Sequence, residues 1–252
     1  MTVEADGASA ALRGRIDAVD LARTIAIVGM VVFHFTRDLE DFGLIAAGTT
    51  LAGGWAVFAM CVAGGFIFLA GVSLVLAHGA GVRWAGYFRR LGLLVAAAGA
   101  VSVATWVAMP HAFIFFGILH SIALSSVLGL AFLRRPLWLT GLVGVGVVAL
   151  PMVYRSEVFT GRWGAWTGLS PWVPPTLDFE PVFPWFAPFL FGMMFAHLAA
   201  RFGVWTWLRV TFGGGRVPKA LLWPGRHSLM IYLVHQPILI GLLWCAIKLG
   251  LV

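Results

Sequence analysis

Four ionisable residues share one face of an apolar segment near the start of the chain. Asp20, Arg23, His34 and Asp38 lie in DAVDLARTIAIVGMVVFHFTRD. At about 100° per residue, Arg23 and His34 project within about 20° of each other, and Asp38 returns to the direction of Asp20. Charged groups at membrane depth are costly and usually face a cavity or a partner. The stripe predicts a functional site, the alternative being an interfacial ion pair with a separate core histidine.

A second polar group lies in the last apolar segment, GRHSLMIYLVHQPILIGLLW. Ser228, Tyr232 and His235 are spaced i, i+4 and i+7, so they share one helix face. His235 and Gln236 stand just before Pro237, which frees a backbone carbonyl about one turn earlier. These two side chains therefore either satisfy that carbonyl or contribute to a polar site.

Three further candidates lie between these segments. His120, in FFGILHSIALSS, is either a hydrogen-bonded core histidine or part of a polar site. Arg89 and Arg90, in YFRRLG, are either anchors at the inner membrane surface or contacts for a phosphorylated donor. The sequence has no G-x-S-G, H-E-x-x-H, Cys/His metal spacing or Walker loop, so we expect no metal site and no ATP hydrolysis.

The composition places these residues in a membrane protein. Of 252 residues, 61% are hydrophobic and 11% are charged, and the mean hydropathy is +0.95. A soluble domain carries about 25% charged residues. The apolar runs are continuous, which predicts an all-α polytopic helical bundle rather than a barrel. About seven transmembrane helices are expected, at 17–37, 52–77, 87–109, 113–133, 137–154, 182–200 and 227–249.

The basic residues predict the orientation of the bundle. With the N-terminus in the cytoplasm, every Lys and Arg of the 17 lies inside except Arg37, Arg155, Arg162 and Lys248. The net charge of +7 is thereby explained by topology, so no nucleic-acid partner is expected. Residues 1–14 are interpreted as a flexible cytoplasmic tail, and 15–252 as a single transmembrane domain. We expect a multi-pass protein of a bacterial inner membrane, and homo-oligomerisation stays open.

Two long loops carry alternatives. The outer loop 155–181, rich in Trp, Pro and Gly, is either an interfacial aromatic belt or a lid or acceptor surface on the outer face. The inner loop 201–226 is basic and glycine-rich. It is either a membrane anchor or a phosphate-binding surface, since arginines and glycine amides suit anions.

Several ordered blocks resemble the bacterial relatives of the heparan-α-glucosaminide N-acetyltransferase catalytic domain. They are RIDAVDLARTIAIVGMVVFHFTRDLEDFG, FIFLAGVSLVLA, YFRRLGLL, FIFFGILHSIALSSVL, LDFEPVFPWFAPFLFGM and GRHSLMIYLVHQPILIGLL. The D-x-x-R-x10-H pattern of Asp20, Arg23 and His34 is also similar to the acyltransferase-3 family. The resemblance implies acetyl transfer from cytoplasmic acetyl-CoA to an amine or hydroxyl, commonly of a glycan or amino sugar, at the far side of the membrane.

The resemblance also suggests roles for the polar residues. Lysosomal members carry their catalytic histidine in the loop after the first span, whereas the corresponding LEDFGLIAAGTTLAGG has none. His34, oriented by Asp38, then becomes the expected general base or acetyl carrier, with His120 and His235 assisting the reaction. The predicted donor-binding residues are Asp20, Arg23, Arg89, Arg90, Arg226, Ser228, Tyr232 and Gln236. Two rivals remain, a proton-coupled small-solute transporter and a haem-binding redox protein.

Overall fold

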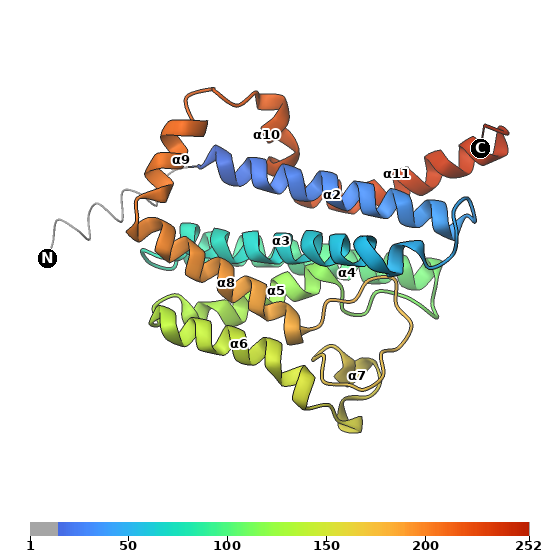
Figure 1. Cartoon of the computed structure of the whole chain (residues 1–252), viewed down its shortest axis with the longest axis horizontal. Helices are drawn as coiled ribbons and strands as arrows, with labels where there is room; N and C mark the ends of the chain where they lie inside the picture. Colours follow the sequence, from blue (N-terminus) through green and yellow to red (C-terminus); the bar gives the residue numbers. More distant parts are fainter. Residues whose placement is uncertain (1–14, 252) are drawn as a thin grey trace, which may run out of the picture. The chain divides into compact units, whose positions relative to one another are not determined.

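The structure, a computed structural model, describes residues 15–251 and confirms the all-α prediction (Figure 1). Among these residues the only strand-like contact is an isolated parallel bridge between Phe116 and Phe179. The α-helices are α2 Asp17–Asp41, α3 Gly53–His78, α4 Trp84–Ala108, α5 Ile118–Gly129, α6 Leu137–Val153, α7 Arg162–Ala165, α8 Val182–Arg201, α9 Val204–Phe212, α10 Lys219–Arg226 and α11 Ser228–Lys248. Three 3₁₀ turns are η1 Thr49–Leu51, η2 Leu130–Phe132 and η3 Glu157–Phe159. The predicted tail, 1–14, lies outside the described residues.

Five of these helices, α2, α3, α4, α8 and α11, are long and apolar enough to cross a membrane. The other two predicted spans are also helical but shorter, Ile118–Phe132 and Leu137–Val153. Large apolar side chains stay exposed along the long helices, among them Ile25 at 66% and Val107 at 74%. Such surfaces suit lipid rather than water. Which side of the membrane each end faces remains a prediction.

The structure differs from the sequence-based expectation at the start of α5 and in the loop 201–226. The span predicted from residue 113 begins at Ile118, because Gly117 is extended (φ −97°, ψ −169°) and the segment before it pairs with Phe179 instead. The inner loop 201–226 contains two helices, α9 and α10. Three glycines, 213–215, separate them, two with positive φ. The loop is therefore mostly helical, and its glycine content is why the sequence did not predict these helices.

The described chain divides into two compact units, whose boundaries fall within α3 and α9. We call residues 67–206 the mid-chain unit, and residues 15–66 with 207–251 the terminal unit. The single-domain interpretation of residues 15–252 stays a prediction. Each unit carries part of the predicted site and is described by itself.

In the mid-chain unit, α8 packs closely on α3 and α6. A Cβ at Gly71 of α3 would overlap the carbonyl oxygen of Phe189, and one at Gly192 of α8 would overlap that of Phe68. Such close backbone approach through small residues is typical of membrane helix packing. Phe189 and Leu190 are fully buried at this contact. Glycine is thus required where the two backbones meet.

In the terminal unit, α10 is fastened to α2. The Thr24 hydroxyl donates to the carbonyl of Leu221 (2.7 Å) and accepts from the amide of Gly225 (2.9 Å). A Cβ at Gly225 would overlap the carbonyl oxygen of Asp20. Helix α11 begins two residues after α10 ends and also packs on α2, as the ribbon shows (Figure 1).

The glycine contact yields a stability prediction. Gly71→Ala should lower the free energy of unfolding by about 1–3 kcal/mol, because overpacking forces the backbones apart. Gly99→Ala is the matched control, since a Cβ there meets nothing within 4 Å. Alanine at that position should be neutral or stabilising by up to about 1 kcal/mol through helix propensity. Thermal melts in detergent micelles would measure both, and a Gly71→Ala variant as stable as Gly99→Ala would contradict the contact.

Candidate functional site

A buried polar cluster joins α2 and α11 within the terminal unit. The Gln236 side-chain amide donates to Asp38 Oδ1 at 2.6 Å, and Asp38 is only 3% exposed. The imidazole rings of His34 and His235 lie 5.0 Å apart between centroids, tilted by 60°. Four predicted site residues from the two ends of the sequence therefore meet in one place.

Backbone geometry fixes the proton on one of these imidazoles. His235 Nδ1 lies 2.7 Å from the carbonyl oxygen of Tyr232. A carbonyl only accepts, so Nδ1 carries the hydrogen, and Nε2 of the neutral ring keeps a lone pair. That Nε2 is buried and has no hydrogen-bond partner among residues 15–251. An oriented imidazole with an open lone pair has the form of a general base.

The same cluster holds two further buried atoms without a hydrogen-bond partner within the described chain. They are Asp38 Oδ2 and Gln236 Oε1. An unpaired buried polar atom costs about 1–3 kcal/mol, so natural structures leave few of them. Three such atoms in one cluster can accept hydrogen bonds from a polar ligand carrying hydroxyl or amine groups. This is the feature that the helical stripe alone did not reveal.

Sequence reasoning paired Asp38 with His34, whereas the structure gives Asp38 the Gln236 amide as a hydrogen-bond partner. His34 is half-buried against the His235 ring. The other two predicted residues of α11 are Ser228 and Tyr232. Ser228 is the first residue of the helix, and Tyr232 contributes its carbonyl to His235.

The N-terminal end of the stripe is an ion-pair network. Asp20, 1% exposed, accepts from Arg15 Nε (2.7 Å), Arg23 (2.9 Å) and Arg226 Nε (3.1 Å). Arg226 also donates to Asp17 at 2.9 Å. The shared carboxylate raises the pKa of Arg226 through its hydrogen bond and charge, so the guanidinium stays charged. Three predicted donor-binding residues thus already pair with one another and attach α10 to α2.

His120 occupies a satisfied network in the mid-chain unit. Its Nδ1 accepts from the amide of Gly117 (3.3 Å), so Nε2–H donates to Ser102 Oγ (3.2 Å). The Ser102 hydroxyl in turn donates to the carbonyl of Ile114 at 2.6 Å. Both ring nitrogens are therefore engaged, which suits a positioning role better than proton transfer. Its predicted catalytic role stays a prediction.

Two carboxyl groups near His120 escaped the sequence analysis. Asp178 Oδ2 accepts from the amide of Ile118 (3.0 Å) and so caps the start of α5. Burial and the neighbouring Asp178 hold the pKa of Glu180 well above its ordinary range. Glu180 Oε2 is buried without a hydrogen-bond partner among the described residues. The acidic pair in LDFEP was the available signal, but nothing in the sequence indicated burial.

Arg89 and Arg90 lie exposed on α4 in the mid-chain unit. Within residues 15–251, no three His, Cys, Asp or Glu side chains gather in a way that could hold a metal ion. Both cysteines, Cys61 and Cys245, are free and exposed.

Five spanning-length helices indicate a multi-pass membrane protein, and two of them, α2 and α11, carry the buried polar cluster. A family model described as "Heparan-alpha-glucosaminide N-acetyltransferase, catalytic" matches residues 15–237, and the chain belongs to this family. The match confirms the resemblance drawn from the sequence blocks and covers the whole polar cluster. No curated protein and no solved structure matches the chain.

The ion-pair network predicts a structural role for Asp20. Asp20→Asn leaves three guanidinium groups around a neutral amide and should destabilise the protein by about 3 kcal/mol, as breaking a buried pair does. Asp17→Asn removes only an exposed pair and should cost about 0–1 kcal/mol. Melting temperatures of the two variants in detergent would compare them. If Asp20→Asn melted like the wild type, the network would not be what holds α10 on α2.

The raised pKa of Glu180 predicts a pH-dependent stability. Between its ordinary pKa and the raised one, the unfolded chain releases the proton while the folded chain keeps it, so stability falls as pH rises. Glu180→Gln has no such titrating proton. The melting temperature of the variant minus that of the wild type should therefore increase from pH 5 to pH 8. Glu157→Gln, at an exposed carboxylate, should show a constant difference. A constant difference for Glu180→Gln would refute the buried, protonated carboxyl.

Proposed function

We propose that the chain is an integral-membrane acetyltransferase that moves an acetyl group from cytoplasmic acetyl-CoA to an amine or hydroxyl of a glycan-type acceptor at the outer face. One observation carries the proposal, namely the oriented, unpartnered Nε2 of His235 beside the unpartnered oxygens of Asp38 and Gln236. Family membership supports the acetyl-transfer chemistry and the acetyl-CoA donor. The spanning-length helices support action within a bilayer, which we assign to the bacterial inner membrane.

The proposed reaction is a direct transfer. His235 Nε2 takes a proton from the acceptor as its nitrogen or oxygen attacks the thioester carbonyl. The carbon–sulfur bond then breaks, and the departing sulfur of CoA takes the proton from the imidazolium. Neither an oxidant nor a metal is needed, because the acetyl group and one proton simply exchange places.

The neighbouring side chains have supporting roles in this proposal. Asp38 and Gln236 accept hydrogen bonds from the acceptor's polar groups, and their own 2.6 Å bond fixes both side chains. His34, against the His235 ring, stabilises the charge that develops on the carbonyl oxygen or on the second imidazole. The general-base role expected for His34 therefore moves to His235, with His34 as its partner in the imidazole pair.

Substitution of the two histidines tests the proposal. His235→Ala and His34→Ala should each lower kcat at least about 100-fold, the usual contribution of a positioned acid or base. His227→Ala is the matched control. This histidine belongs to the same unit, is exposed, stacks on Trp223 and is not part of the polar cluster. It should retain activity within about twofold.

The assay follows labelled acetyl from acetyl-CoA to amino sugars in proteoliposomes, with release of CoA measured in parallel. Full activity in both His34→Ala and His235→Ala would remove the imidazole pair from the mechanism. Uptake of a solute without release of CoA would instead support the transporter hypothesis.

A further inference from the structure

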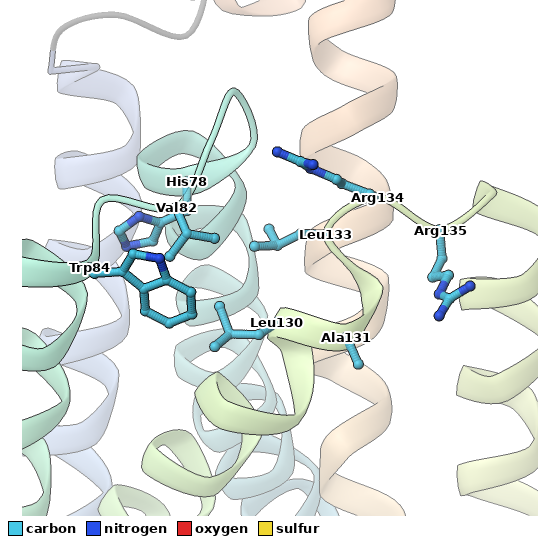
Figure 2. A pocket seen from close by; sticks show the side chains of 8 residues that line it. All are labelled: His78, Val82, Trp84, Leu130, Ala131, Leu133, Arg134 and Arg135. Atoms are coloured by element: carbon cyan, nitrogen blue, oxygen red, sulfur yellow. The ribbon is translucent and has the colours of Figure 1, made fainter.

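A cavity of about 380 Å³ opens in the mid-chain unit, and none of the site residues described so far lines it (Figure 2). It lies between the end of α3, the start of α4 and the segment from η2 to Arg135. The residues that line it include His78, Trp84, Leu130, Leu133, Arg134 and Arg135. The wall thus combines an indole, two leucines, an imidazole and two guanidinium groups.

The aromatic side of the cavity presents the accessible indole of Trp84. Trp84 is 54% exposed, although indoles in protein cores are mostly buried. Its orientation is set by Phe88, on which it stacks at 5.6 Å and 24°, and by Tyr87, which meets it edge-on at 6.1 Å. Tyr87 is itself fixed by a hydrogen bond to the carbonyl of Ser126 (3.3 Å). A rigidly placed, accessible indole is a stacking platform for a planar ligand.

The imidazole contributes a hydrogen-bond donor. His78 Nδ1 accepts from the backbone amide of Arg83 at 3.3 Å. The proton of the neutral ring is therefore on Nε2. His78 is 6% exposed and lines the cavity, so this donor belongs to the cavity wall rather than to bulk water.

The positive charge at this cavity lacks compensating carboxylates. The sequence contains no Asp or Glu from residue 42 to residue 156. The side chains of Arg134 and Arg135 are exposed and make no hydrogen bond or ion pair with any residue that the structure describes. Figure 2 shows Arg134 reaching toward the side of His78 and Val82, whereas Arg135 points to the other side. In the terminal unit, by contrast, Arg23 and Arg226 share Asp20.

We infer that this cavity binds the adenosine 3′,5′-bisphosphate end of the acyl-CoA donor. The purine would stack on Trp84 between Leu130 and Leu133, and Arg134 would pair with a phosphate. The inference rests on the proposed function, because the donor assigned there is the phosphorylated purine. It differs from the sequence-based expectation, which gave the phosphates to Arg23, Arg89, Arg90 and the 201–226 loop. Of these, the structure pairs Arg23 and Arg226 with Asp20.

Equilibrium binding of adenosine 3′,5′-bisphosphate to the purified full chain tests the inference without any turnover. Trp84→Ala and Arg134→Ala should each weaken binding about tenfold, the range of one base stack or one charge-assisted phosphate contact. Trp84→Phe, which keeps a stacking ring, should recover most of the affinity. The matched controls, Trp138→Ala and Arg201→Ala, remove an exposed indole and an exposed guanidinium outside the cavity and should bind like the wild type.

Competition separates a nucleotide from other phosphates. A membrane-lipid phosphate or free phosphate could pair with Arg134 but cannot stack on Trp84. Short-chain phosphatidic acid and inorganic phosphate should therefore compete at least about tenfold more weakly than the bisphosphate, and should not respond to Trp84→Ala. Equal competition by either anion would overturn the nucleotide assignment and leave an anion site.

Kinetics separates failure of the inference from failure of the proposed function. His235→Ala should abolish acetyl transfer while the bisphosphate still binds. If the wild type transfers acetyl but Trp84→Ala and Arg134→Ala leave the KM for acetyl-CoA unchanged, the cavity assignment is wrong and the function stands. If the wild type binds the bisphosphate through Trp84 yet transfers no acetyl group, the cavity assignment holds and the proposed function fails.

Discussion

The polar site of the terminal unit depends on one buried carboxylate. Asp20 is almost fully buried, and three guanidinium groups compensate its charge, those of Arg15 before α2, Arg23 within α2 and Arg226 of α10. One turn further along α2, Thr24 bonds both ends of the α10 backbone segment from Leu221 to Gly225. These contacts fix where α10 ends, and α11 begins two residues later. The register of α11 against α2, and hence the meeting of Gln236 with Asp38, follows from this attachment.

Two of the buried histidines, His120 and His235, differ in how completely their hydrogen bonds are satisfied. His120 has partners on both ring nitrogens, and its serine neighbour is also bonded. The α2–α11 cluster instead leaves a nitrogen and two oxygens buried without partners among residues 15–251. Within the described chain, single unpartnered atoms also occur on Ser121, Glu180 and His197, but a buried polar atom without a partner is costly, so three of them in one cluster favour a site that a ligand completes. This contrast is the reason for proposing His235, rather than His120, as the base.

The sequence predicted much of this architecture because the relevant signals are local. Helical periodicity placed Asp20, Arg23, His34 and Asp38 on one stripe, and hydropathy located all seven apolar helices, five of them with spanning length. The Asp38–Gln236 bond joins residues 198 positions apart, so it depends on tertiary packing that no local pattern encodes. The proton position on His235 was likewise hidden, because it is set by the carbonyl of its own helix. Helices α9 and α10 were missed since glycines and basic residues interrupt the apolar pattern of that segment.

The distribution of acidic residues has a consequence for the donor. A CoA thioester carries several phosphate charges at one end and a neutral thioester at the other, so it needs two chemically different sites. The terminal unit offers acid–base groups, while its arginines beside Asp20 are largely compensated. The mid-chain unit has acidic residues only at Glu157, Asp178 and Glu180, all after α6, and the side chains of Arg134 and Arg135 form no ion pair with the described residues. An aromatic cavity among uncompensated guanidinium groups favours the nucleotide end, and a cluster of unpartnered polar atoms favours the reacting end.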